Sequence, residues 1–299
     1  MKNFSNQALS YLFACGAIFF WSTVATAFKL SLEYLDPVQL VFFASIFSTI
    51  TLFIIVLVQR KLPLIRELDR ADVFRYFLLA LLNPFLYYIV LLNAYDLLSA
   101  QEAMAINYSW VIMMAILSFP ILKQRANIGT LIAILISYFG VVIIATKGDP
   151  IAFEFTSSIG VIYALITTVI WALFWLLNTK QSNDSVVSLF VIFCFSIIFV
   201  SFAMIISPSL RPITLYGLAA SAYIGLFEMG VTFVMWQYAL SLSSNINKIT
   251  SLAFITPFLS LLIIYMVIDE QILASSIVGI SLIILGLLVQ RYFSKNQES

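Results

Sequence analysis

Long apolar stretches recur along almost the whole chain, and polar residues are confined to the short breaks between them. All but the fifth of ten such stretches reach about 20 residues, the length that an α-helix needs to cross a bilayer. They cover residues 9–32, 38–58, 73–95, 101–121, 128–146, 157–178, 185–207, 213–239, 246–268 and 273–293. Because none is long enough to hold two spans, we predict an all-α, polytopic membrane protein with ten transmembrane helices.

The composition excludes an ordinary soluble fold and several kinds of chemistry. Hydrophobic residues make up 63% of the 299 residues and charged residues 10%, whereas soluble domains are about 45–50% apolar and about 25% charged. The chain has no histidine, which excludes Ser-His-Asp catalysis and histidine zinc sites. Cys15 and Cys194 lie within apolar stretches, so we expect no disulfide, no metal and no cofactor. The net charge of +1 argues against nucleic acid as a partner.

Lysine and arginine lie mainly on one side of the predicted membrane. If the N-terminus is cytoplasmic, the inside segments hold eleven of them, and the outside segments hold only Lys29, Lys147 and Arg211. Cytoplasmic loops carry an excess of these residues, so we predict that both termini are cytoplasmic. The first stretch imitates a secretory signal peptide, but its Trp21 segment has a counterpart at Trp171. We therefore expect it to be a structural helix.

The two halves of the chain resemble one another. Gly140 in the fifth stretch matches Gly286 in the tenth at an offset of 146 residues, and the Trp-containing segments match at an offset of 150. We predict two five-helix repeats, residues 1–150 and 151–299, of which the second crosses the membrane inverted because five is odd. Inverted repeats are typical of alternating-access transporters, whose substrate site lies near the midplane between the halves. Internal repeats also occur in channels, which stay an alternative.

Several short motifs follow one another in a fixed order. They are Phe20-Trp21-Ser22-Thr23 with Lys29, Asp36-Pro37, Ile170-Trp171-Ala172, Thr256-Pro257, Asp269-Glu270, Gly279 and Gly286. In this order, and over essentially the whole chain, they resemble the ten-helix, EamA-type branch of the drug/metabolite transporter superfamily. The resemblance implies a secondary transporter in the inner (plasma) membrane, acting as a monomer or weak dimer in the lipid bilayer.

One further motif bears on the substrate. Ile106-Asn107-Tyr108-Ser109-Trp110 is similar to the fourth-helix Asn-Tyr-x-Trp-Pro motif of bacterial aromatic amino acid exporters. The chain departs from the family pattern at Val111, Gln124 and Ala44, where Pro, Glu and Arg are common. The resemblance implies efflux of a small neutral or zwitterionic metabolite, an amino acid or a related compound.

Two carboxylates are candidates for coupling transport to protons. Glu228 lies near the middle of the eighth stretch. Because an ionisable side chain is costly inside a membrane, one at this depth indicates a functional role. Thr232 is one helical turn away, which places its hydroxyl within hydrogen-bonding reach. The alternative is a neutral Glu228 bonded to a neighbouring helix. Glu102 is the second candidate, and its alternative role is to cap the fourth helix, where the helix dipole favours negative charge.

Polar and aromatic residues inside the stretches are candidates for binding the substrate. Asn offers donors and acceptors, and an indole offers a flat apolar wall with one N–H. The candidates are Asn107, Tyr108, Trp110, Trp171, Trp175, Asn178, Tyr87, Trp236, Lys248 and Thr256. We predict that they line a central cavity between helices 1, 3, 4, 6, 8 and 9. Aromatics also form interfacial belts, and Lys248 has the alternative of extending to the membrane surface.

Two prolines lie within the predicted helices. Pro84 and Pro257 interrupt the third and ninth helices, either as the hinge of a gate or as static kinks.

The fifth and tenth helices should be peripheral supports, because their interiors hold no ionisable residue. A non-transporting scaffold is a further alternative. An intramembrane enzyme is the weakest one, because Tyr95-Asp96 lacks the second Gly-x-Gly-Asp element of aspartyl proteases.

Overall fold

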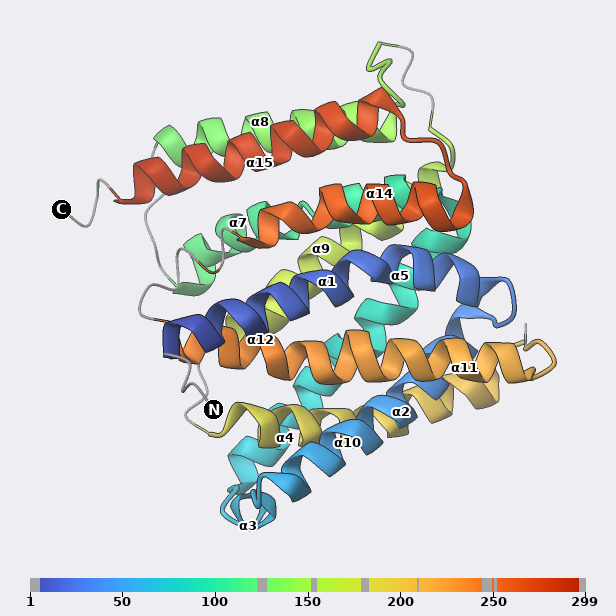
Figure 1. The fold of residues 1–299 in the computed structure, drawn as a ribbon, viewed down its shortest axis with the longest axis vertical. Coiled ribbons are helices and arrows are strands. Elements are labelled where there is room, and N and C mark those ends of the chain that lie inside the picture. Colours follow the sequence, from blue (N-terminus) through green and yellow to red (C-terminus); the bar gives the residue numbers. More distant parts are fainter. Residues whose placement is uncertain are drawn as a thin grey trace. The chain divides into compact units, whose positions relative to one another are not determined.

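The computed structural model describes residues 6–122, 128–151, 155–178, 183–208, 210–243, 249 and 252–295. Every regular element within these ranges is a helix (Figure 1), which confirms the predicted all-helical, polytopic membrane fold. Six helical stretches are long and apolar enough to cross a membrane: Asn6–Leu32, Pro37–Val58, Arg70–Leu97, Ser158–Asn178, Ser185–Ile206 and Leu215–Ser241. Three shorter apolar helices cover Leu131–Ala145, Ala253–Ile268 and Ala274–Val289. The predicted count of ten is therefore approximate.

The chain divides into two compact units. Unit 1 comprises Met1–Ile89 and Gln181–Ile263, and unit 2 comprises Val90–Lys180 and Ile264–Ser299. Each unit thus combines segments from both halves of the sequence. These units are defined by spatial contacts rather than by sequence similarity, so the division into repeats 1–150 and 151–299 stays a prediction.

Unit 1 is built around α1, α2, α10 and the interrupted span that follows α10. Its helices are α1(Asn6–Leu32), α2(Pro37–Val58), α3(Leu62–Ile65), α4(Arg70–Ala80), η1(Leu81–Leu86), α10(Ser185–Ile206), α11(Leu215–Tyr223), η2(Ile224–Val231), α12(Thr232–Ser241) and η3(Ala253–Ile255). Unit 2 contains α6(Ala100–Asn107), α7(Trp110–Leu122), α8(Ile128–Ala145), α9(Ser158–Asn178) and α15(Ala274–Lys295). Two helices, α5(Tyr87–Leu97) and α14(Thr256–Ile268), begin in unit 1 and end in unit 2.

Short polar side chains set where many helices begin. Asp36 caps α2 by accepting a hydrogen bond from the Val38 amide at 2.9 Å, and Pro37 occupies the first turn, where no N–H is needed. Other helices begin at comparable caps: Asp69 for α4, Ser99 for α6, Asp184 for α10 and Thr214 for α11. These caps satisfy amide groups that the first helical turn leaves unpaired.

Two spans are interrupted at their midpoints by π-helical segments. In Arg70–Leu97 the interruption is η1, where Pro84 cannot donate a backbone hydrogen bond and Asn83 leaves the helical region at φ −144° and ψ 127°. In Leu215–Ser241 the interruption is η2. Pro257, in contrast, lies at the second residue of α14 directly after η3, so it begins a helix instead of kinking one.

The glycines whose spacing suggested a repeat lie at a close helix contact in unit 2. Helices α8 and α15 run side by side (Figure 1), and a Cβ atom on Gly140 would lie 2.5 Å from the Gly279 carbonyl oxygen. Ser137 donates to the Ile283 carbonyl at 3.2 Å across the same interface. Small residues permit this approach, as is typical of helix pairs in membranes.

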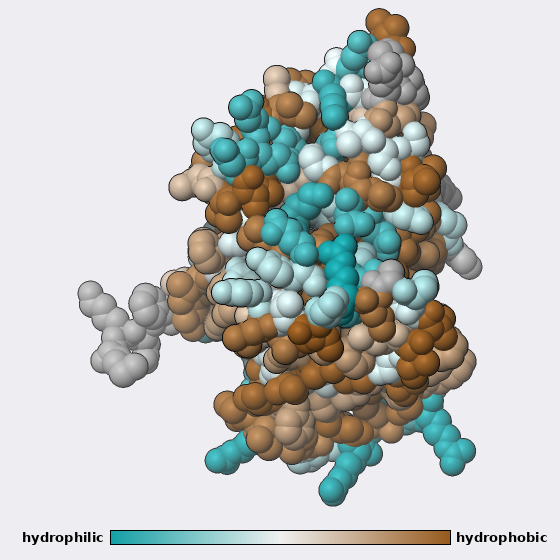
Figure 2. Space-filling view, turned by 90° about the vertical axis from the view of Figure 1, so that its right-hand side faces the viewer, coloured by the Kyte–Doolittle hydropathy of each residue, from teal (hydrophilic) through white to brown (hydrophobic). Residues whose placement is uncertain are grey.

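Large apolar side chains are exposed on many helices. Broad brown areas of hydrophobic residues appear on the face shown in Figure 2. Ile205 and Leu215 are each 81% exposed, Val58 76% and Leu135 72%. Exposure of such a surface to water would be unfavourable. The exposed apolar residues are therefore consistent with helices that face lipid.

Candidate functional site

The residues proposed from sequence fall into two groups. Unit 1 holds Tyr87, Glu228, Trp236 and Thr256, whereas unit 2 holds Glu102, Asn107, Tyr108, Trp110, Trp171, Trp175 and Asn178. Lys248 lies outside the described residues. The hypothesis of one shared central cavity stays a prediction.

Glu228 is a buried carboxylate in the middle of its span. It lies at the midpoint of Leu215–Ser241, inside η2, and is 7% exposed. The Tyr88 hydroxyl, itself fully buried, donates a hydrogen bond of 3.0 Å to Oε1. Oε2 is buried and has no hydrogen-bond partner among the described residues. Among the described residues, the carboxylate is therefore held through one oxygen only.

The prediction that Thr232 donates a hydrogen bond to Glu228 is wrong. The Thr232 hydroxyl donates instead to the Phe227 backbone carbonyl, five residues earlier. Threonine in a helix commonly bonds back to a carbonyl of the preceding turn, and the wider π-helical turn brings Phe227 into that position. The partner of Glu228 comes from Tyr88, which the sequence-based choice of neighbouring Tyr87 missed. The doublet Tyr87-Tyr88 was the only local signal, because hydropathy does not show which of two adjacent tyrosines faces another helix.

Helix α2 lies against η2 at the level of Glu228. A Cβ atom on Gly225 would lie 3.0 Å from the Ser48 amide nitrogen, and one on Gly230 would lie 3.0 Å from Thr51 Cγ2. Glu228 lies between these two glycines in the sequence, so Ser48 lies at about the same depth of unit 1 as Glu228. The Ser48 hydroxyl is buried and has no partner in the described part of the chain.

Buried polar atoms without a described hydrogen-bond partner are frequent in unit 1. They include atoms of Thr26, Ser45, Ser48, Asn83, Glu228, Thr256 and Ser260. Such atoms are costly in an apolar environment unless water or a ligand satisfies them. Asn83 lies at the midpoint of Arg70–Leu97 as Glu228 does in its own span, so each interrupted helix carries one such polar side chain at mid-span.

Aromatic contacts join α1 to the span of Glu228. Phe20 stacks on Phe227 with ring centroids 4.7 Å apart, and Trp21 packs against Trp236 at 5.1 Å. These contacts place the predicted residue Trp236 beside the first helix of the chain. Thr256 is close to the same helix, because its carbonyl accepts a hydrogen bond of 3.4 Å from Ser22.

A cluster of indole rings forms in unit 2. Trp171 of α9 packs against Trp110 with ring centroids 6.2 Å apart and against Trp175 at 5.9 Å. Asn107, at the end of α6, donates to the Thr167 hydroxyl at 2.8 Å. Thus three of the predicted tryptophans lie together. Tyr108 caps the end of α6, and Asn178 is the last residue of α9.

Two carboxylates gather at the start of α6. Glu102 accepts hydrogen bonds from the Ser99 amide at 3.1 Å and the Thr156 hydroxyl at 2.7 Å. Glu270 accepts from the amides of Ala100 and Gln101 at 3.0 and 3.1 Å. The helix dipole favours negative charge at this end, so helix capping accounts for the burial of Glu102.

Comparison with known proteins agrees with this architecture. Residues 8–146 and 158–291 match the EamA-like transporter family. A solved crystal structure superposes with a TM-score of 0.66 at 19% identity, covering 97% of this chain and 99% of the other, which shows a shared fold.

Relatives in other organisms are named as transporters. An "uncharacterized transporter" of Clostridium kluyveri is 26% identical over 190 residues, which cover 61% of this chain and only 60% of that protein. Another, of Archaeoglobus fulgidus, is 22% identical over 84% of this chain and 86% of its own. These matches support a membrane transporter rather than an enzyme, in agreement with the resemblance found in the motifs. Since the family match spans both halves of the sequence, the chain belongs to the EamA-like transporter family.

Proposed function

We propose that this transporter moves a small neutral or zwitterionic metabolite by alternating access, and that Glu228 couples this movement to protons. The observation that carries the proposal is the buried Glu228 carboxylate, which lies at mid-span and is held through Oε1 by Tyr88. Carboxylates at membrane depth commonly mark proton relays and ion pathways.

The geometry around Glu228 suits the uptake and release of a proton. Because Oε2 has no partner among the described residues, a proton can bind there without displacing a hydrogen bond of the protein. The bond from Tyr88 to Oε1 can persist in both protonation states, so the side chain keeps its position while its charge changes. A carrier needs such a group to be accessible from one side of the membrane at a time.

The cluster of Trp110, Trp171 and Trp175 supports an amphipathic substrate. Flat apolar rings and the Asn107 amide, which bonds to Thr167, match the mixed character of an amino acid or a related metabolite. The excess of lysine and arginine on one side of the spans favours cytoplasmic termini in the inner membrane. Resemblance to amino acid exporters favours efflux.

The test uses purified protein in proteoliposomes. Thermal stabilisation by a panel of amino acids, amines and nucleosides first identifies a substrate, because a ligand that binds the native state stabilises it. Accumulation driven by a pH gradient and exchange at equal pH are then measured for the wild type and Glu228→Gln. We expect the variant to lose accumulation and to keep exchange, since Gln preserves the shape of the protonated acid. Glu67→Gln, at an exposed position of the same unit, is the matched control.

Other outcomes would contradict the proposal. Unchanged accumulation in Glu228→Gln removes this carboxylate from the coupling mechanism. A flux that does not saturate indicates a channel, and no flux of any tested solute indicates a scaffold.

A further inference from the structure

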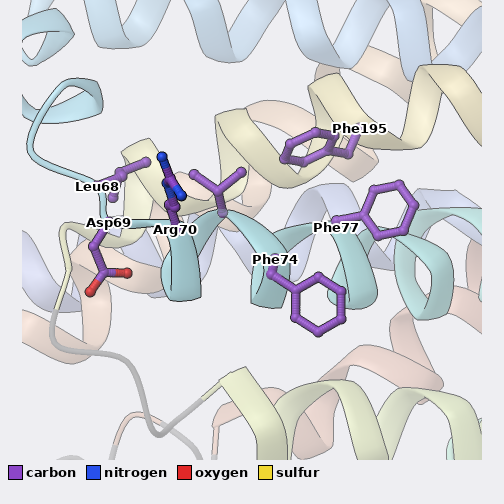
Figure 3. A pocket seen from close by; sticks show the side chains of 7 residues that line it. Leu68, Asp69, Arg70, Phe74, Phe77 and Phe195 are labelled. Atoms are coloured by element: carbon purple, nitrogen blue, oxygen red, sulfur yellow. The ribbon is translucent and has the colours of Figure 1, made fainter.

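A hollow of about 360 Å³ lies on unit 1 beside the start of α4. Its lining residues are Leu68, Asp69, Arg70, Val73, Phe74, Phe77 and Phe195 (Figure 3). Asp69 and Arg70 lie at one end of the close-up view, and Phe77 and Phe195 lie at the other. The hollow is therefore amphipathic, with a charged end and an aromatic end.

The aromatic end continues along the span. Phe77 packs against Phe195 and Phe199 of α10, with ring centroids 5.7 and 4.9 Å apart, and Phe199 in turn lies 5.6 Å from Phe85. On the outer side, Phe74 is 63% exposed. An apolar track thus leads from the hollow towards the midpoint of Arg70–Leu97.

The charged end carries an available positive charge. The Asp69 carboxylate accepts the Asp72 amide at 2.7 Å as the cap of α4. Arg70 is exposed and forms no ion pair with any described residue, whereas nearby Lys61 is paired with Asp184 at 2.7 Å. Residues 60–75 contain five basic and three acidic side chains, so this end of unit 1 has a small excess of positive charge.

We propose that this hollow binds an anionic phospholipid of the surrounding membrane. The lipid phosphate meets the Arg70 guanidinium, whose planar donors match phosphate oxygens. One acyl chain lies over Phe74, Phe77 and Phe195. Arg70 is the first residue of a membrane-spanning stretch, which is the depth at which lipid headgroups lie.

An anionic phospholipid matches both the charged end and the aromatic end of the hollow. A soluble phosphate compound would leave the exposed Phe74 ring without a partner, and a lipid without net charge would not use the basic surroundings of Arg70. Glu228 is not among the residues that line the hollow, and neither is Tyr88, its described hydrogen-bond partner.

The test is native mass spectrometry of the full-length protein, titrated with phosphatidylglycerol or phosphatidylcholine of the same acyl chains. We expect phosphatidylglycerol to be retained preferentially and Arg70→Gln to weaken its binding about fivefold, since one basic residue at an anionic surface contributes about 1 kcal/mol. Arg66→Gln is the matched control, because Arg66 is an exposed arginine just before α4 that does not line the hollow. Val73→Trp, at a position 38% exposed, should fill the hollow and also reduce retention.

Three results would overturn the proposal. One is equal retention of the two lipids. A second is an effect of Arg66→Gln as large as that of Arg70→Gln, which indicates diffuse attraction to all the basic residues near the start of α4. The third is loss of phosphatidylglycerol binding when inorganic phosphate is present at the same concentration as the lipid, which indicates that the acyl chain contributes little. Thermal unfolding of each variant verifies that it is folded.

Discussion

The Tyr88 hydroxyl donates a hydrogen bond of 3.0 Å to Oε1 of Glu228 and so joins the two spans that are interrupted by π-helical segments. The two residues are 140 positions apart in the sequence. π-Helical turns inside α-helices frequently occur at functional sites, and here they occur at the midpoints of both spans.

Removing this hydrogen bond should affect both stability and coupling. We expect Tyr88→Phe to lower the free energy of unfolding by about 1–2 kcal/mol, because a buried carboxylate loses its described donor. Proton-driven accumulation should fall while substrate exchange persists. Thermal unfolding and proteoliposome assays measure the two effects, and Tyr11→Phe, at a ring 37% exposed on α1 of the same unit, is the control. Equal behaviour of the two variants would show that the Tyr88–Glu228 bond has no special role.

Close packing of α2 against η2 should make Gly225 intolerant of a side chain. A Cβ atom there would meet the backbone of Ala44 and Ser48, which cannot move aside easily. We expect Gly225→Ala to lower the free energy of unfolding by about 1–3 kcal/mol, as overpacking typically does. Gly16→Ala is the control, because the added atom would meet only the flexible end of Met235. A thermal midpoint at or above that of the wild type for Gly225→Ala contradicts the prediction.

The side chain of Gln101 should be important for unit 2. Its amide nitrogen donates to the Gln271 carbonyl at 2.8 Å, and its oxygen accepts from the Leu273 amide at 3.0 Å and the Ser276 hydroxyl at 2.7 Å. Gln101→Leu removes all three bonds and leaves buried partners unsatisfied. We expect a loss of about 1–3 kcal/mol in the free energy of unfolding. Gln271→Leu, at an exposed side chain of the same segment, should be nearly neutral in the same thermal assay.

The indole cluster should contribute to substrate binding. We expect Trp110→Ala to weaken the binding of the stabilising metabolite about fivefold, through loss of one aromatic contact. Trp110→Phe should retain most of the affinity. Phe139→Ala, at a ring 53% exposed on α8, controls for the general loss of an aromatic side chain. Wild-type affinity in Trp110→Ala, measured by titration of thermal stability, would exclude this ring from the site.

Sequence reasoning about side-chain contacts was confirmed for one pair of residues within a helix and was wrong for the hydrogen-bond partner of Glu228, which comes from another helix. Trp171 and Trp175 are one helical turn apart, so helical geometry alone allows them to share a face, as the structure shows. Thr232, one turn away, was the candidate partner of Glu228, with a bond to a neighbouring helix as the alternative, and the structure shows a bond from Tyr88 of another helix. Helix periodicity predicts which residues share a face within one helix, but not which face of another helix lies opposite.

The sequence by itself determined the helical, membrane-spanning class, because apolar runs of about 20 residues can satisfy their backbone in lipid only as helices or closed barrels. It also determined local boundaries such as the cap of α2 at Asp36, since a cap depends on residues two or three positions away. Tertiary structure alone decided that Tyr88 reaches Glu228 and that Ser48 lies at the same depth. Both relationships depend on the rotation and register of packed helices, which are set by contacts such as those of Gly225 and Gly230 and which no local pattern contains.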